Sequence, residues 1–381
     1  MGAGEARGFP ELSTAMMVAG EVSGDIHAGN LLQRLRTIRP GVEAFGVGGE
    51  RLHAAGLDLV ASSDELAHMG LVEVIRELPR IRAVMHRLVK EAAARRPNVA
   101  VLVDSPDFNL RLAARLARLE IPVVLYVSPQ LWAWRRGRVR TVRRLAREVL
   151  CILPFEVGFY EGYGVNARYV GHPLVDDLAD DGLLDHEIAP VPGRLALLPG
   201  SRAMEIRQLL PVMIESLRNM ADDEVTDAAL IQAPGTAEIT ARVLSECPSD
   251  PRLRVVTGSD RRSVHASCSL AWTASGTATL ECALLDVPMI VGYRLQRVSA
   301  TLARLLVRVP HIALANLIAE QRAAPELLQH DWNPDRLVFL SRELLATGGE
   351  EQRRALATVR ERLGKPGASL RAAEAVAEYL R

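Results

Sequence analysis

The feature that most constrains this chain is the regular alternation of short apolar runs with longer amphipathic segments. The runs at 98–104 (NVAVLVD) and 121–128 (IPVVLYVS) are rich in β-branched residues and almost wholly apolar. Such runs are typical of parallel strands that helices cover on both faces. Between the runs, apolar residues recur at the three- and four-residue spacing of helices. The alternation predicts βαβ units and an α/β protein with parallel sheets.

The alternation occurs in two series. In the first half of the chain, strands are expected at 14–20, 42–49, 98–104, 121–128, 148–154 and 167–173. In the second half, they are expected at 194–199, 227–232, 253–257, 269–273 and 287–292. A chain of 381 residues is too long for one ordinary core. We therefore expect two Rossmann-like domains with a ligand cleft between them.

The domain boundaries follow from composition. An acidic, proline-containing stretch lies between the two series and is interpreted as a linker. The expected segments are an N-terminal extension (1–13), an N-terminal domain (14–175), the linker (176–193), a C-terminal domain (194–345) and C-terminal helices (346–381). The last segment is expected to pack back on the N-terminal domain or on a partner subunit.

Charge and cysteine content narrow the function. The chain has 46 basic and 46 acidic side chains, so no overall field attracts nucleic acid. Its four cysteines are scattered without a C-x-x-C pair, which argues against a zinc site or a disulfide framework and favours a reducing compartment. The N-terminal residues are polar, and no apolar run is long enough to cross a bilayer. We expect a soluble or peripheral protein.

A turn in the second half is the first candidate ligand site. The apolar run 194–198 ends at Pro199-Gly200-Ser201-Arg202, and a helical pattern follows. This hinge falls at the carboxyl end of the sheet, where α/β proteins bind ligands. Backbone N–H groups at a helix start, together with Arg202, suit a phosphate. An ordinary turn with a solvated arginine explains the same residues equally well.

The segment 272–288 (WTASGTATLECALLDVP) is a second turn of this kind. Ser275, Gly276 and Thr277 precede a helix and are expected to leave N–H groups open toward a phosphate. Glu281 lies in the second turn of that helix, where a carboxylate can bind a ribose diol. With Arg202, these residues predict two converging phosphate-type sites in the second domain.

Two further turns follow strands of the first half. In VAGEVSGDIHAG (18–29), Gly20 and Gly24 allow close backbone approach, and a helix capped by Asp25 is expected at 25–38. In LVDSPDFN (102–109), Asp107 is expected to cap the next helix, which leaves Asp104 facing the cleft. Partial burial there would raise the pKa of Asp104 and make it a usable general base. Its alternative role is to bond N–H groups within the turn.

Two basic segments have several interpretations. The segment 126–145 places Trp132 and Trp134 among arginines, which suits nucleic acid, an anionic lipid surface or a plain solvated helix. The segment 68–90 carries an apolar stripe with basic flanks. Such a stripe suits a membrane surface, although a core-facing helix is its more frequent cause.

Taken in order, these segments resemble the lipid-A-disaccharide synthases, glycosyltransferases of the GT-B fold, in which two Rossmann-like domains face each other across a cleft. The matching motifs are GEVSGD, MGLVEV, VDSPDFN, YVSPQLWAW, LPFE, VGHP, LPGSR, ASGTATLE and VGYR, followed by ALANLIA. The chain departs from the family at Ser105, where alanine is frequent, and at 320–329, which lacks an expected glycine. The resemblance implies inverting transfer from UDP-2,3-diacylglucosamine to 2,3-diacylglucosamine 1-phosphate (lipid X), which gives a β-1,6-linked disaccharide 1-phosphate and UDP.

The resemblance also implies roles for individual residues. Asp104 would be the general base, and Arg202 would contact a phosphate of UDP or of the acceptor. The implied UDP site comprises Ser201, Arg202, Ser275, Gly276, Thr277, Glu281 and Asn316. The implied N-terminal cleft comprises Gly20, Glu21, Ser23, Gly24 and Asp25. No metal and no cofactor are implied.

The implied partners are the two lipid substrates and the cytoplasmic face of the inner membrane of a Gram-negative bacterium, with no nucleic acid. Lipid-facing positions would be Met69, Leu71, Val72, Val74, Ile75, Trp132 and Trp134. A homodimer through the C-terminal helices is also implied. Two alternatives stay open: a UDP-sugar epimerase of the same fold, and a non-catalytic nucleotide-binding protein that has no use for Asp104.

Overall fold

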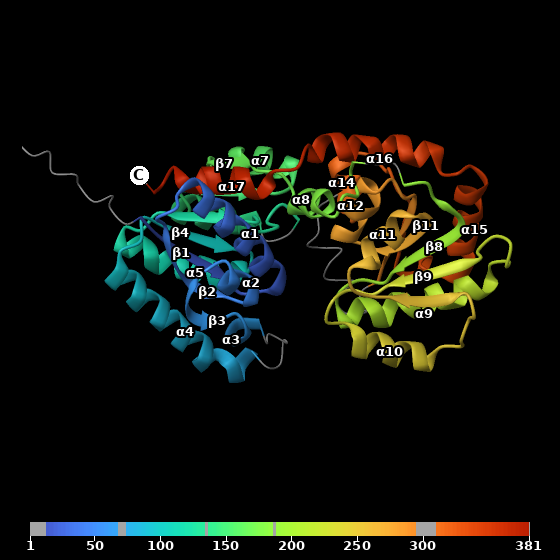
Figure 1. The fold of residues 1–381 in the computed structure, drawn as a ribbon, viewed down its shortest axis with the longest axis horizontal. Helices are drawn as coiled ribbons and strands as arrows, with labels where there is room; N and C mark the ends of the chain where they lie inside the picture. The colour runs from blue at the N-terminus through green and yellow to red at the C-terminus, as the bar shows by residue number, and fades with distance from the viewer. Residues whose placement is uncertain (1–12, 68–73, 134–135, 186–187, 295–309, 381) are drawn as a thin grey trace, which may run out of the picture. The chain divides into compact units, whose positions relative to one another are not determined.

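The structure is a computed structural model, and it describes residues 13–67, 74–133, 136–185, 188–294 and 310–380. The chain divides into two compact units (Figure 1). The first unit comprises Met1–Pro173 with Pro366–Arg381, and the second comprises Leu174–Lys365. Each unit has its own parallel sheet, so the α/β architecture expected from the sequence is confirmed.

The first unit contains a seven-stranded sheet of order β3-β2-β1-β4-β5-β6-β7, with all neighbours parallel. The strands are β1 (Thr14–Ala19), β2 (Glu43–Gly48), β3 (Asp58–Ser62), β4 (Val99–Val103), β5 (Val123–Tyr126), β6 (Glu148–Cys151) and β7 (Ala167–Tyr169). Gly46 packs tightly against β1: at its φ of 149°, a Cβ would lie 1.8 Å from the carbonyl oxygen of Met17. Only glycine fits there.

Helices cover both faces of this sheet. They are α1 (Val22–Ile38), α2 (Glu50–Ala54), α3 (Asp64–Ala67), α4 (Val74–Arg95), α5 (Pro106–Leu116), α6 (Val139–Leu145), α7 (Pro154–Glu161) and α17 (Ala368–Ala377), with short 3₁₀ turns η1 (Ala117–Leu119) and η2 (Arg136–Arg138). Successive β1 residues point to opposite faces. Met16 and Val18 join a core with α4 and α5, whereas Met17 joins a core with α1 and α17.

The second unit contains a six-stranded sheet of order β10-β9-β8-β11-β12-β13, also with parallel neighbours. The strands are β8 (Val191–Leu198), β9 (Asp227–Ile231), β10 (Leu253–Val256), β11 (Cys268–Ala274), β12 (Met289–Tyr293) and β13 (Glu326–Leu328). The helices are α8 (Pro173–Asp180), α9 (Ala203–Asn219), α10 (Ala237–Glu246), α11 (Asp260–Ala266), α12 (Thr277–Leu284), α14 (Leu314–Ala319), α15 (Pro334–Ala346) and α16 (Glu350–Leu363), with η3 (Gln329–Asp331).

The unit boundaries differ from the domain boundaries drawn on composition. The stretch 176–193 was expected as a linker, but helix α8 occupies its start, because Leu174, Val175 and Leu178 are buried. The expected C-terminal segment 346–381 divides between the units. Helix α16 stays in the second unit, where the amide of Gln352 bonds both the N–H and the carbonyl of Met289. Helix α17 returns to the first unit.

Candidate active site

The turn after β4 holds two non-glycine residues in the left-handed region. Asp104 has φ 51° and Ser105 has φ 37°. Neighbouring bonds hold this conformation: Asp104 N–H donates to the Tyr126 carbonyl at 3.1 Å, and Asn109 Nδ2 donates to the carbonyls of Val103 and Asp104 at 3.0 and 2.7 Å. Backbone strain of this kind costs about 1–3 kcal/mol per residue and clusters at functional sites. The strain, together with its place at the carboxyl end of β4, makes Asp104 a candidate for chemistry.

Asp107 does not cap helix α5, contrary to the expectation. The helix begins at Pro106, whose fixed φ suits the first helical position, and Ser105 is the N-cap residue. Asp107 lies in the first turn and forms an ion pair with Arg138 at 2.6 Å. Its exposed carboxylate thus has a partner of its own.

Asp25 is not the cap of its own helix, because α1 begins earlier, at Val22. The buried carboxylate of Asp25 accepts hydrogen bonds from the N–H groups of Gly49, Arg51 and Leu52 at 2.6, 2.9 and 3.2 Å. These donors belong to the start of α2, which lacks partners within its own first turn. Asp25 is therefore a structural residue that ties α2 to α1, although it was expected in the ligand cleft.

Gly20, Glu21 and Gly24 of the GEVSGD segment lie beside the turn formed by Asp104 and Ser105. A Cβ on Gly20 would stand 3.1 Å from Ser105 Oγ, and one on Gly24 would stand 3.7 Å from Asp104 Cβ. Ser105 Oγ also lies 3.5 Å from Glu21 Oε1. Strands β1 and β4 are neighbours, so their carboxyl ends bring the two turns together. Ser23 is exposed in the first turn of α1.

Trp132 was expected to face lipid, and the structure shows that it does not. Its side chain is buried: Nε1 donates to Glu156 Oε1 at 3.0 Å, and the indole ring meets Phe155 edge-on at 4.9 Å between ring centroids. A tryptophan N–H needs a partner when it is buried, and Glu156 supplies one. The sequence carries no signal that links these positions.

The other lipid-facing positions are mostly outside the described structure. Met69, Leu71, Val72 and Trp134 lie outside the described residues, and Val74 and Ile75 fall in the first turn of α4, where the side chains are not described. Farther along the stripe 68–90, the side chains belong to the core: Val84, Met85 and Leu88 are buried. That half of the stripe is a core-facing helix surface.

In the second unit, the PGSR turn joins β8 to α9. Arg202 is the N-cap residue, and its side chain is 80% exposed, with Nη1 3.0 Å from Glu205 Oε1. The N–H groups of Ser201 and Arg202, at the helix start that was expected to suit a phosphate, donate to Glu205 Oε2 at 3.2 and 3.3 Å. The Glu205 carboxylate thus occupies the position beside these N–H groups where a phosphate was predicted. The Arg202 guanidinium remains exposed to solvent.

The turn after β11 lies next to the PGSR turn, because β8 and β11 are paired with Leu198 opposite Thr273. Ser275 Oγ donates to the Ile312 carbonyl at 3.1 Å. Gly276 has φ 120°, and a Cβ there would meet no atom within 4 Å. The turn is therefore open at Gly276, immediately before helix α12, as a phosphate-binding turn requires.

Glu281 and Asn316 have different surroundings. The Glu281 side chain is 18% exposed, and Oε1 lies 2.9 Å from His265 Nδ1. Asn316 is fully buried, and both its amide hydrogens are used: Nδ2 donates to the Ala324 carbonyl at 2.9 Å and to Glu326 Oε1 at 2.8 Å. Asn316 therefore supports the loop around Ala324 and has no donor left for a nucleotide.

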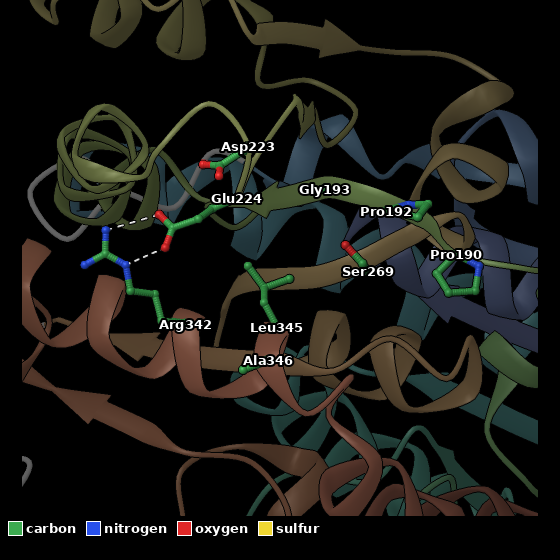
Figure 2. Close-up of a pocket in the computed structure, with 9 residues that line it drawn as sticks. All are labelled: Pro190, Pro192, Gly193, Asp223, Glu224, Ser269, Arg342, Leu345 and Ala346. Carbon is green, nitrogen blue, oxygen red and sulfur yellow. Dashed lines mark hydrogen bonds and ion pairs between the residues drawn. The ribbon is translucent and has the colours of Figure 1, made fainter.

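A pocket of about 600 Å³ lies at the other end of the strands of the second sheet, near their amino ends (Figure 2). Its lining includes Gly193 and Ser269, which stand near the amino ends of β8 and β11. Across the pocket wall, Arg342 pairs with Glu224 at 2.6 Å. In α/β proteins ligands bind at the carboxyl ends of the strands. The candidate functional residues therefore lie in the turns that follow β4, β8 and β11, and not in this pocket.

No helix among the described residues is long and apolar enough to span a bilayer. No group of three histidine, cysteine, aspartate or glutamate side chains among them is placed to hold a metal ion.

Two units, each with a parallel sheet covered by helices, give the chain the fold of the GT-B glycosyltransferases and related epimerases. Solved structures agree. A putative UDP-N-acetylglucosamine 2-epimerase from Listeria monocytogenes matches with a TM-score of 0.64 at 12% identity, covering 96% of this chain and 94% of that one. The glycotransferase of kitacinnamycin matches with a TM-score of 0.61 at 16% identity, covering 98% and 100%.

The sequence comparisons identify the family within this class. The family described as Lipid-A-disaccharide synthetase matches residues 15–378. A lipid-A-disaccharide synthase of Anaeromyxobacter dehalogenans (strain 2CP-C) is 43% identical over 374 residues, which cover 96% of this chain and 97% of the relative. The chain belongs to the lipid-A-disaccharide synthetase family and is a glycosyltransferase. The resemblance drawn from the motifs is confirmed.

Proposed function

We propose that this chain transfers the sugar of UDP-2,3-diacylglucosamine to the 6-hydroxyl of lipid X, which forms a β-1,6-linked disaccharide 1-phosphate and releases UDP. Family membership over nearly the whole chain supports the reaction. The observation that carries the site assignment is the strained Asp104 turn, which packs against the GEVSGD turn at the carboxyl ends of β4 and β1.

The proposed chemistry needs one base and one source of positive charge. The Asp104 carboxylate takes the proton of the acceptor hydroxyl as its oxygen bonds to the anomeric carbon. The bond from that carbon to the diphosphate oxygen breaks on the opposite side, so the configuration inverts. Arg202 and the open turn at Gly276 stabilise the negative charge that develops on the departing UDP.

Two alternatives predict different products. A UDP-sugar epimerase would change the donor without an acceptor, and a binding protein would release no UDP. The family match disfavours both alternatives, because the family is one of synthetases. The likeness to an epimerase, at 12% identity, is a likeness of fold alone. The deciding experiment measures UDP release with and without lipid X. We expect release only when both lipids are present; release or an epimerised donor without lipid X would contradict the proposal.

We further propose that the protein works at the cytoplasmic face of the inner membrane, where Met69, Leu71, Val72, Val74 and Ile75 contact the bilayer. Diacylated substrates favour this location, because their acyl chains partition into lipid. The exposed basic side chains of Arg140, Arg143 and Arg144 on α6 support it, since anionic lipids attract such clusters.

A homodimer is also part of the proposal, and the fold limits how it forms. Ala372, Ala375 and Val376 of α17 are buried in the core that α1 shares. If α17 contributes to a dimer, it must do so by exchange between copies or through its outer face. Molar mass in solution, measured by light scattering for the full chain, tests this.

A further inference from the structure

Glu281 belongs to a buried hydrogen-bonded series of three side chains, in which His265 lies between Glu281 and Cys282. His265 of α11 is wholly buried, and its two ring nitrogens reach two residues of α12. Nδ1 lies 2.9 Å from Glu281 Oε1, and Nε2 lies 3.4 Å from the Sγ of Cys282, which is also wholly buried. The imidazole therefore joins the two helices through the carboxylate of Glu281 and the thiol of Cys282.

The partners determine which nitrogen carries the proton. Burial raises the pKa of Glu281, but the hydrogen bond and charge of His265 and the charges of Arg262 and Arg261 outweigh it, and the pKa lies below its usual value. An ionised carboxylate only accepts hydrogen bonds. Nδ1–H must therefore be the donor to Oε1, whether the ring is neutral or charged.

Arg262 acts on this carboxylate through its charge, while its ion pairs are with two aspartates. Arg262 is bound by Asp181 at 2.6 Å and by Asp177 at 3.2 Å. Within the described part of the chain, the Glu281 carboxylate makes its hydrogen bond to His265 through Oε1. Oε2 is thus left for a ligand, on a side chain that reaches the surface through its 18% exposed fraction.

We propose that His265 is a positioning residue for nucleotide binding: its Nδ1–H holds Glu281 so that the carboxylate meets both hydroxyls of the ribose. The inference rests on the proposed function, because it assumes that Glu281 binds the ribose. A glutamate side chain has three rotatable bonds, and holding one oxygen in place removes most of that freedom before the ligand arrives. His265 itself does not touch the ligand.

The test compares the binding of UDP and 2′-deoxy-UDP by titration calorimetry. For the unmodified protein, loss of one hydrogen bond to a charged group predicts that UDP binds about 10–100-fold more tightly than the deoxy compound. Glu281→Gln should reduce this ratio to near one. His265→Gln should lower it about tenfold, because the glutamine amide reaches toward the Nε2 position and leaves Oε1 unbound.

Matched variants separate positioning from packing. His265→Asn places an amide N–H near the Nδ1 position and should retain most of the ratio. Cys282→Ala, which changes the group on the other side of the imidazole, should retain the full UDP to 2′-deoxy-UDP affinity ratio. A folded His265→Gln protein with an unchanged ratio would overturn the role of His265. An unchanged ratio in Glu281→Gln would instead remove Glu281 from the ribose site, and the proposed function would fail at that residue.

A second measurement applies if the histidine variants do not fold. In ¹⁵N spectra of the unmodified protein, one buried histidine should show a protonated Nδ1 whose signal moves on addition of UDP. The same signal should move in Glu281→Gln, which identifies it as His265. If UDP moves no such signal while it binds, the inference is wrong.

Discussion

At the scale of single residues, the site depends on side chains whose surroundings differ from those of ordinary turns. Asp104 is held in a left-handed conformation beside Ser105, and two backbone carbonyls there are satisfied by one asparagine, Asn109. Arg202 keeps an exposed guanidinium although its own N–H bonds Glu205. In both turns the backbone is fixed internally, so a substitution at the functional side chain should leave the fold intact.

Asp104→Asn is expected to lower kcat by about 10²–10⁴-fold, because the amide cannot take the acceptor proton. The near-identical shape should preserve the turn, and UDP affinity should stay unchanged, since we place the UDP site in the second unit. Steady-state rates with calorimetry of UDP binding measure both effects. Asp107→Asn is the control, and it should keep near-normal activity because Asp107 pairs with Arg138. The reverse pattern would show that the base was misassigned within this loop.

Arg202→Ala is expected to lower the transfer rate by about 10²–10³-fold, because the developing diphosphate charge loses its counter-charge. Thermal melting should change little, since the side chain is 80% exposed. Arg207→Ala is the matched control, an exposed arginine on the same helix. Equal activities of the two variants would return Arg202 to the role of a solvated turn residue.

At the scale of elements, helix α7 holds the loop that follows β5. Its Glu156 accepts from Trp132 Nε1 at 3.0 Å and from Leu153 N–H at 3.1 Å, and Tyr160 Oη donates to the Pro129 carbonyl at 2.7 Å. Burial raises the pKa of Glu156 to about 7, although the hydrogen bonds that its own carboxyl group accepts oppose this shift. The loop is thus anchored by a carboxyl group that titrates near neutral pH.

Glu156 should make the first unit less stable as pH rises. Between its unfolded pKa near 4.5 and about 7, the folded state holds a proton that the unfolded state has lost, so stability falls with rising pH. The full shift corresponds to about 3 kcal/mol. The measurement is the unfolding free energy from pH 5 to 7.5 for the unmodified protein and for Glu156→Gln.

The difference between these two proteins is the informative quantity, because a second group opposes Glu156. Burial lowers the pKa of His27 to about 4, so His27 adds stability as pH rises toward 6.5. His27 is common to both proteins and cancels in the difference. We expect Glu156→Gln to gain relative stability across this window; a constant difference would contradict the raised pKa.

At the scale of the whole molecule, the two units have their own sheets, yet the first is completed by the end of the chain. Arg371 Nε donates to the Val170 carbonyl at 2.8 Å, and Arg168 bridges Glu148 and Glu378 at 2.9 and 2.8 Å. The first unit therefore needs residues from both ends of the sequence. Its proposed attachment to the membrane is tested on the full chain.

Replacing Leu71, Val74 and Ile75 together by serine should release the protein from vesicles that contain anionic lipid and raise KM for the acylated substrates. The melting temperature should stay the same if these side chains meet lipid. Val84→Ser on the same helix is the control: Val84 is buried in the core, so this change should lower the melting temperature and leave vesicle binding of the folded protein intact. Unfolding of the triple variant would assign its positions to the core as well.

The sequence alone was sufficient for those features that depend on local order. Every strand expected from the sequence is present, and the central ones were visible because parallel strands buried on both faces leave an uninterrupted apolar signature. The edge strands β3 and β13 were missed, since short, partly polar runs lack that signature. The turns at Asp104 and Arg202 were located because a strand end followed by a helix start is visible in the sequence.

Only the tertiary structure decided which groups those turns and helices meet. Asp25 accepts hydrogen bonds from N–H groups 24 to 27 positions away, and Trp132 donates to Glu156. The side-chain amide of Asn316 donates to Ala324 and Glu326. No local rule assigns such partners, because hydrogen-bond groups are satisfied wherever the chain path brings them together. For the same reason, the sequence determined that Glu281 was a candidate ligand, but the packing of α11 against α12 decided that His265 stands behind it.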